Sequence, residues 1–148
     1  GVNPAMKICK DSNAPFSQVV YAGLSFFDCS EKEISNNMER QIIIETVILE
    51  RFTSVIGTIG SVAVYIGLLG TILGILKAFH DVSTSGSGGI SVIIGGISEA
   101  LSTTAAGLTI AVPAVAVYNY CMKKIDDFIK DMELAASETM DLISAIKK

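Results

Sequence analysis

Residues 55–76 read VIGTIGSVAVYIGLLGTILGIL and contain no charged side chain. As an α-helix this run would rise roughly 33 Å, which matches the hydrocarbon core of a bilayer at about 30 Å. A second apolar run, residues 90–120, would rise roughly 45 Å and must tilt or project beyond the lipid. The polar, Gly-rich stretch HDVSTSGSGG separates the two runs at residues 80–89 and is typical of a turn at a membrane surface. The sequence therefore predicts a membrane hairpin.

The charges lie almost entirely outside this hairpin. The chain has 148 residues, of which 50% are hydrophobic, and its mean hydropathy is +0.54. Between Arg51 and Lys123 the ionisable groups other than tyrosine and cysteine are Lys77, His80, Asp81 and Glu99. The net charge is −4, and the absence of a basic patch in the sequence argues against nucleic-acid binding. Two water-exposed segments are thus expected to flank the hairpin.

The orientation of the hairpin follows from its flanking cations. The open ends carry Arg40, Arg51, Lys123, Lys124 and Lys130, whereas the loop is flanked by Lys77 alone. The positive-inside rule therefore places both ends of the chain in the cytoplasm. We expect a cytoplasmic helical region at 1–54, a transmembrane helix at 55–79, a periplasmic loop at 80–89, a transmembrane helix at 90–120 and a cytoplasmic C-terminal helix at 121–148.

The cysteines predict neither a disulfide framework nor a metal site. Cys9, Cys29 and Cys121 are odd in number and form no CxxC or Cys/His pair, so reduced cytoplasmic thiols are expected. No cofactor is indicated. The sequence begins at Gly1 without a signal peptide, and we expect it to be part of a longer protein.

Two helices are predicted before the first span. Residues 12–27 place apolar side chains on one helical face, with Pro15 in the first turn. Ser30 and Glu33 have the spacing of a capping box, so a second helix should begin at about Glu31. No Pro or Gly follows before Gly57, which predicts one uninterrupted helix running into the membrane.

A further helical face follows the second span. Its members recur at steps of three and four and are mostly apolar: Met122, Ile125, Ile129, Met132, Ala136, Thr139, Ile143 and Ile146. This face predicts packing against the helix that begins at Glu31, either within one chain or in a neighbouring subunit. The fold class is then an all-α membrane protein whose long helices extend from the membrane into the cytoplasm.

Small residues line one face of each span. They are Gly67, Gly70 and Gly74 beside Thr71 in the first, and Ala100, Gly107 and Ala111 beside Thr104 in the second. Such faces allow close helix packing in lipid, and they also suit the wall of a narrow lumen. The threonines have two interpretations as well, because a hydroxyl either returns to a carbonyl one turn back or faces whatever the small residues enclose.

Glu99 is the one carboxylate within the second span. A charge near the bilayer centre costs on the order of 2.5–3.5 kcal/mol unless it meets water, a partner or a proton. Glu99 therefore either lies near the interface, bonded to Ser102 or Thr103, or lines a hydrated cavity used by ions. Transport across the whole bilayer needs another acid, which a second polypeptide would have to supply.

Pro113 interrupts the hydrogen bonding of the second span, because it cannot donate to the carbonyl of Thr109. This predicts a kink, or in the bolder interpretation a hinge.

Three blocks of the sequence resemble the proton-channel family of MotA, TolQ and ExbB, and most of all its ExbB/TolQ branch. They are LERF at 49–52, IGLLGTILGILKAF at 66–79 and GISEALSTTAAGLTIAVPAVAVYN at 96–119, with weaker similarity in PFSQVVYAGL at 15–24. The resemblance implies a pentameric ring of subunits with three membrane helices each. Such a ring encloses single-span partners of the ExbD or TolR type, whose membrane aspartate takes up and releases protons.

Carried over by position, the resemblance makes Thr71, Thr104 and Glu99 pore-lining residues of the proton pathway. It departs from the family in two respects. The first membrane helix of the family is absent from this sequence, and Val64 stands where many relatives have proline.

The resemblance implies a subunit of a motor in the bacterial inner membrane that converts proton flow into mechanical work on the cell envelope. The alternative is a structural membrane scaffold that conducts no protons. An enzyme is not expected, because the single histidine, His80, lies at the loop without a serine elbow or metal-ligand set. Whether such a motor serves nutrient uptake, envelope integrity, gliding or defence is left open.

Overall fold

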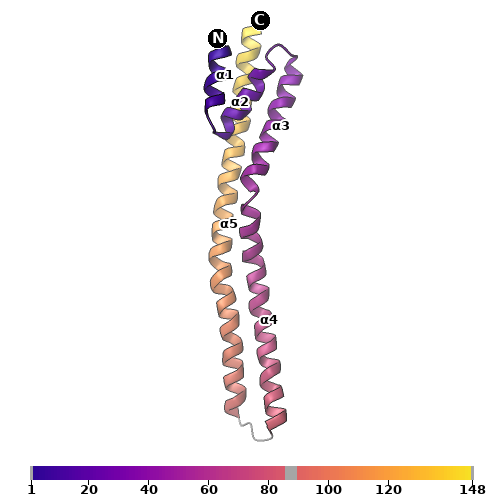
Figure 1. Cartoon of the computed structure of the whole chain (residues 1–148), viewed down its shortest axis with the longest axis vertical. Coiled ribbons are helices and arrows are strands. Elements are labelled where there is room, and N and C mark those ends of the chain that lie inside the picture. Colours follow the sequence, from indigo (N-terminus) through magenta and orange to yellow (C-terminus); the bar gives the residue numbers. More distant parts are fainter. Residues whose placement is uncertain (1, 86–89, 148) are drawn as a thin grey trace. The chain divides into compact units, whose positions relative to one another are not determined.

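The computed structural model describes residues 2–85 and 90–147, and within these residues every regular element is a helix (Figure 1). The helices are α1 (Val2–Asp11), α2 (Pro15–Ser25), α3 (Glu31–Glu50), α4 (Thr53–Ser85) and α5 (Ile90–Lys147). The all-α prediction is confirmed for this part of the chain. Residues 2–11 form α1, for which no separate helix was predicted within the helical region expected at 1–54.

The chain divides into two compact units. One combines Gly1–Arg51 with Cys121–Lys148, and the other is Phe52–Tyr120. Helix α5 contributes its first part to the second unit and its last part to the first. The two units are described in turn.

In the first unit the starts of α2 and α3 follow from local chemistry. Pro15 occupies the first turn of α2 after Ala14 in an extended conformation, where a missing N–H costs nothing. The Ser30 side chain accepts from the Glu33 N–H at 3.4 Å, and the Glu33 carboxylate accepts from the Ser30 N–H at 3.0 Å. The predicted capping box and the start of α3 at Glu31 are confirmed.

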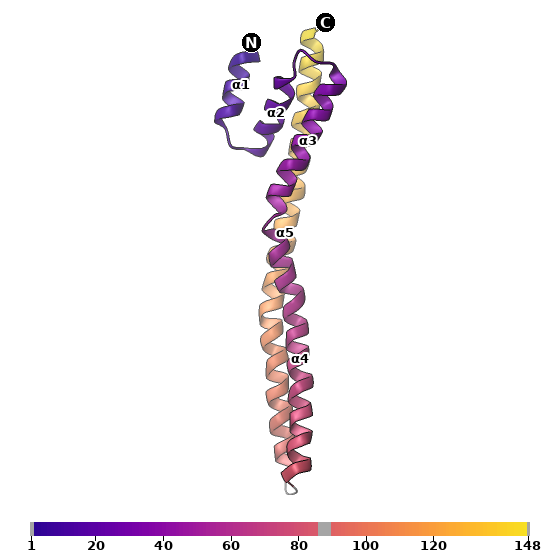
Figure 2. The ribbon, with the colours of Figure 1, turned by 45° about the vertical axis from the view of Figure 1, so that its right-hand side comes forward.

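The core of this unit joins α2, α3 and the C-terminal part of α5. Its fully buried members are Val19, Ile34, Met38, Met132 and Ile143. Figures 1 and 2 show α3 running beside this part of α5. Within one chain, therefore, the C-terminal face packs as an intrachain bundle. At the end of that face Ile146 stays 65% exposed.

The prediction of one uninterrupted helix from Glu31 into the first span is wrong. Helix α3 ends at Glu50, a two-residue turn follows, and α4 begins at Thr53. Arg51 keeps right-handed helical dihedral angles, φ −51° and ψ −43°, so the interruption is local. It falls where the chain passes from one compact unit to the other, and no Pro or Gly is needed there.

The second unit is a hairpin of α4 and the first part of α5, which lie side by side in both views (Figures 1 and 2). Helix α4 reaches Ser85, so residues 80–85, expected in the loop, are helical, and residues 86–89 lie outside the described residues. Turn-forming glycines begin only at position 86. The Thr84 hydroxyl returns to the His80 carbonyl at 3.1 Å, an arrangement that a helix accommodates.

Both helices of the hairpin are long and apolar enough to cross a membrane. In each most apolar window only 17% of the residues are buried, whereas the core helix of a soluble protein is mostly buried. The exposed residues include large apolar side chains on both helices, among them Tyr65, Ile66, Leu69, Leu73, Leu101, Ile110 and Val112. Apolar surface of this extent suits lipid or further helices rather than water.

Candidate site in the membrane hairpin

Helices α4 and α5 pack through a seam of small residues that lets their backbones come into contact. A Cβ added at Gly67 would lie 3.2 Å from the Cα atoms of both Gly107 and Thr104. A Cβ added at Gly74 would lie 2.6 Å from that of Ala100. Gly67 thus lies against Gly107 and Gly74 against Ala100, whereas Gly70 faces the Thr103 side chain. Ala100, Gly107 and Ala111 are buried.

Thr71 and Thr104 meet in the middle of this seam. The Thr71 hydroxyl donates to the carbonyl of Ala100 at 3.1 Å, and the Thr104 hydroxyl donates to the carbonyl of Gly67 at 3.1 Å. Each threonine thereby bonds the backbone of the opposite helix. Their two Oγ1 atoms are also in direct hydrogen-bonding contact, and either one is able to donate.

In this arrangement each of the two hydroxyl hydrogens has more than one acceptor within reach. Each hydroxyl carries a single hydrogen and retains acceptor capacity. The Thr71 hydroxyl also lies 3.3 Å from the Gly67 carbonyl of its own helix, so the pair has more acceptors than hydrogens. Both threonines are only partly buried. A hydroxyl pair of this kind is able to pass a proton along, and it also ties the helices together.

Glu99 lies at the edge of the seam on α5, and its side chain is exposed. The two hydroxyls that could have bonded it at an interface donate elsewhere. Ser102 donates to the Ser98 carbonyl at 2.9 Å, and Thr103 donates to the Ala100 carbonyl at 2.7 Å. The carboxylate of Glu99 is therefore left to solvent, lipid or a partner.

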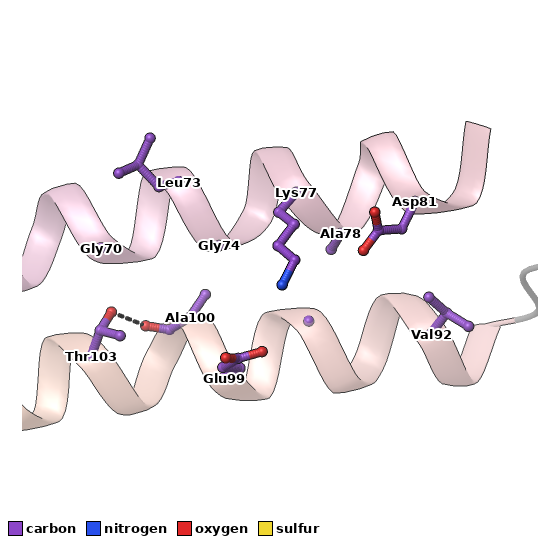
Figure 3. A pocket seen from close by; sticks show the side chains of 11 residues that line it. Gly70, Leu73, Gly74, Lys77, Ala78, Asp81, Val92, Glu99, Ala100 and Thr103 are labelled. Carbon is purple, nitrogen blue, oxygen red and sulfur yellow. Dashed lines mark hydrogen bonds between the residues drawn. The ribbon is translucent and has the colours of Figure 1, made fainter. Parts of the chain in front are cut away.

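Glu99 borders a hollow of about 330 Å³ between the two helices (Figure 3). Helix α4 contributes Lys77 and Asp81 to the same hollow, and neither residue was a predicted site residue. Small residues form its floor, with Gly74 and Ala78 on α4 facing Ala100 and Gly96 on α5. Three of the four ionisable groups noted in the hairpin sequence thus share one hollow.

Helix α5 continues through Pro113, which is exposed. The hydroxyl of Thr109, whose carbonyl loses its usual donor to the proline, donates to the Ala105 carbonyl at 2.8 Å. The kink and the hinge both stay predictions.

The seam also extends further than the sequence analysis expected. A Cβ on Gly60 would lie 2.8 Å from a methyl group of Val115, and one on Gly57 would lie 2.9 Å from the Tyr118 ring. Gly60, Gly67 and Gly74 recur every seven residues, a spacing that keeps one side of a helix against its partner. That repeat was the signal that could have revealed Gly60.

Within residues 2–85 and 90–147, no three His, Cys, Asp or Glu side chains gather closely enough to hold a metal ion. Cys9, Cys29 and Cys121 are free thiols.

An apolar hairpin with a glycine seam and polar groups along it is typical of a helical membrane protein. The chain belongs to the MotA/TolQ/ExbB proton channel family, which it matches over residues 11–134. It is similar to proteins named biopolymer transport protein ExbB. The one from Pseudomonas putida is 32% identical over 114 residues, which are 77% of this chain and 35% of that protein.

Two further ExbB proteins show the same similarity. The one from Aquifex aeolicus is 33% identical over 68% of this chain and 77% of the relative. The one from Neisseria gonorrhoeae is 29% identical over 93% of this chain and 69% of the relative. The chain therefore spans about a third of the Pseudomonas protein and about three quarters of the Aquifex protein. The family is one of proton channels and not a known enzyme family.

Proposed function

We propose that this chain is an ExbB-like proton-channel subunit of a motor in the bacterial inner membrane. The observation that carries the proposal is the pair of hydroxyls, Thr71 and Thr104, bonded across the seam in a chain of the proton channel family. Thr71 and Thr104 are only partly buried, so their hydroxyls place polar groups inside the membrane-spanning part of the hairpin.

In the proposed assembly several copies, five by family resemblance, form a ring around single-span helices of an ExbD or TolR type. The partner supplies the membrane aspartate that the chain itself lacks. Glu99 and Thr104 belong to the same helix, α5, and Glu99 lies on the loop side of the hydroxyl pair. The three side chains face the enclosed lumen, so that protons pass between Glu99, the partner's acid and the hydroxyl pair.

The same proposal fixes the topology. Residues 1–54 and 121–148 lie in the cytoplasm, 55–79 and 90–120 cross the membrane, and 80–89 face the periplasm. Each proton that crosses releases about 2.3 kcal/mol per 100 mV of membrane potential. Movement of the partner helices within the ring transmits this energy to the cell envelope.

Gly67, Gly70, Gly74, Ala100, Gly107 and Ala111 are assigned to helix packing in this proposal, and Pro113 is assigned to a hinge.

Proton flux in liposomes tests the proposal. The chain and its single-span partner are reconstituted together, and Thr104→Val and Thr71→Val are each compared with the matched Thr→Ser variants. Valine keeps the shape and removes the hydroxyl, so flux should be lost from assembled rings, whereas serine should retain it. Thr58→Val is the control, because the Thr58 hydroxyl is exposed and returns to the Ser54 carbonyl of its own helix.

Two results would contradict the proposal. Full flux in both valine variants would remove the role of the hydroxyl pair. An assembled wild-type ring that carries no protons would instead support the structural scaffold.

A further inference from the structure

Lys77 is the single lysine or arginine between Arg51 and Lys123, and it lies beside both acids of the hairpin. Lys77, Asp81 and Glu99 all line the hollow of about 330 Å³. Figure 3 shows the lysine chain reaching from α4 toward α5, with Glu99 on the facing helix and Asp81 one turn further along α4. A charge is costly at membrane depth, so a cation placed beside two anions calls for a physical explanation.

The seam fixes this juxtaposition. Gly74 faces Ala100 so closely that an added Cβ would come within 2.6 Å of the alanine methyl group. Gly96 and Ala78 are in similarly close apposition one turn nearer the loop. Because the two helices cannot slide past each other at these points, Lys77 is held next to the turn of α5 that carries Glu99.

The oxygen atoms around the hollow are the ligands that hard metal cations take. Two carboxylates and the Thr103 hydroxyl border it, and Na⁺, like Ca²⁺ and Mg²⁺, is bound by oxygen. Rings of carboxylates attract cations in general. Without a fixed positive charge, the two carboxylates that border this hollow would attract metal cations.

We infer that Lys77 excludes metal cations from this hollow and so makes the loop-side approach to Glu99 selective for protons. Its ammonium group supplies the positive charge that a bound metal cation would otherwise supply beside the carboxylates. A proton arrives along water and hydroxyl groups without a coordination shell, so it still reaches the carboxylate. Among the described residues Lys77 forms no ion pair of 4.0 Å or less with Asp81 or Glu99. Glu99 is exposed and Asp81 is partly exposed. The inference rests on the proposed function and adds its ion selectivity.

The test uses carbodiimide labelling of Glu99, which needs no ion flux. Dicyclohexylcarbodiimide attacks protonated carboxyl groups in apolar surroundings, and a cation bound to the carboxylate slows the attack. The full chain with its partner is labelled in NaCl or in choline chloride of equal concentration, and the label is located by mass spectrometry. Glu99→Gln gives the blank.

The variants are Lys77→Met, which keeps the length of the side chain and removes its charge, and Lys77→Arg, which keeps the charge. Lys123→Met is the matched control outside the hairpin. NaCl should slow labelling severalfold in Lys77→Met and leave the rate unchanged in the wild type, in Lys77→Arg and in Lys123→Met. Equal effects of NaCl on the wild type and Lys77→Met would overturn the inference.

Thermal unfolding of the same samples provides a readout independent of labelling. Lys77→Met should gain stability from NaCl relative to choline chloride, whereas the wild type should gain none; equal responses would again overturn the inference. Absence of proton flux in the wild type with its partner would contradict the proposed function instead. The labelling and unfolding results test the role of Lys77 whether or not proton flux is observed.

Discussion

Gly107 and Gly67 face each other across α5 and α4 with no room for a side chain between them. A Cβ on Gly107 would lie 2.9 Å from the Cα of Gly67 and 2.7 Å from the carbonyl oxygen of Ala63. Both obstacles are backbone atoms, which have no rotamer by which to move away. The two helices can therefore approach this closely only because neither position carries a side chain.

Replacement of Gly107 by alanine should destabilise the hairpin by about 1–3 kcal/mol, the usual cost of overpacking. The measurement is reversible unfolding in detergent. Gly95→Ala is the matched control on the same helix, because nothing lies within 4 Å of a Cβ added there. Helix propensity favours alanine over glycine by about 1 kcal/mol, so Gly95→Ala should lose no stability. A loss there as large as in Gly107→Ala would show that close packing at the seam does not set the result.

The hydroxyl pair should show energetic coupling. In a double-mutant cycle, Thr71→Val and Thr104→Val together should cost less than the sum of the single variants. The coupling should be about 0.6 kcal/mol and at most about 1.7, the range of hydrogen bonds between membrane helices. Additive losses would mean that each hydroxyl acts only on the carbonyl it bonds.

Two isoleucines on α5 provide a matched test of the first unit. Ile143 is 1% exposed in the core, whereas Ile146, three residues on, is 65% exposed. Ile143→Ala should cost about 2–5 kcal/mol, and Ile146→Ala should stay within about 0.5 kcal/mol, as is usual at a surface. Unfolding is followed by circular dichroism. A large loss in Ile146→Ala would indicate that a neighbouring copy covers this side chain.

The capping box should make stability depend on pH. Hydrogen bonds from the Ser30 hydroxyl and backbone N–H hold the pKa of Glu33 below its ordinary value of 4.5. Because the folded-state pKa is depressed, the stabilisation is complete above pH 4.5 and is lost as pH falls through the folded-state pKa. Glu33→Gln should flatten this part of the stability curve, measured by thermal unfolding.

Glu39→Gln is the control for that experiment, because Glu39 is an exposed glutamate of the same helix. A curve that is unchanged in Glu33→Gln would contradict the assignment.

Local signals in the sequence predicted local structure well. The pair Ser30 and Glu33 announced the start of α3, because a capping box depends on residues three apart. The small faces around Gly67 and Gly107 were visible for the same reason, since each belongs to one helix. The turn after Glu50 was not predictable, because no Gly or Pro causes it and it falls at the boundary between two packed units.

The register between the two spans could not be predicted from the sequence either. Lys77 and Glu99 are 22 positions apart in the sequence, and nothing in either span alone says that they border one hollow. Contacts across the seam, such as those of Gly74 with Ala100 and of Gly67 with Gly107, set which turns of the two helices lie opposite each other. The role proposed here for Lys77 therefore required the structure.

The glycine seam makes the two helices of the hairpin behave as one rigid unit. Where two backbones touch, neither helix is free to rotate or slide without the other. In the proposed ring, relative movement would therefore occur between neighbouring hairpins and around the helices that they enclose, and bending within a hairpin would be confined to the hinge assigned to Pro113.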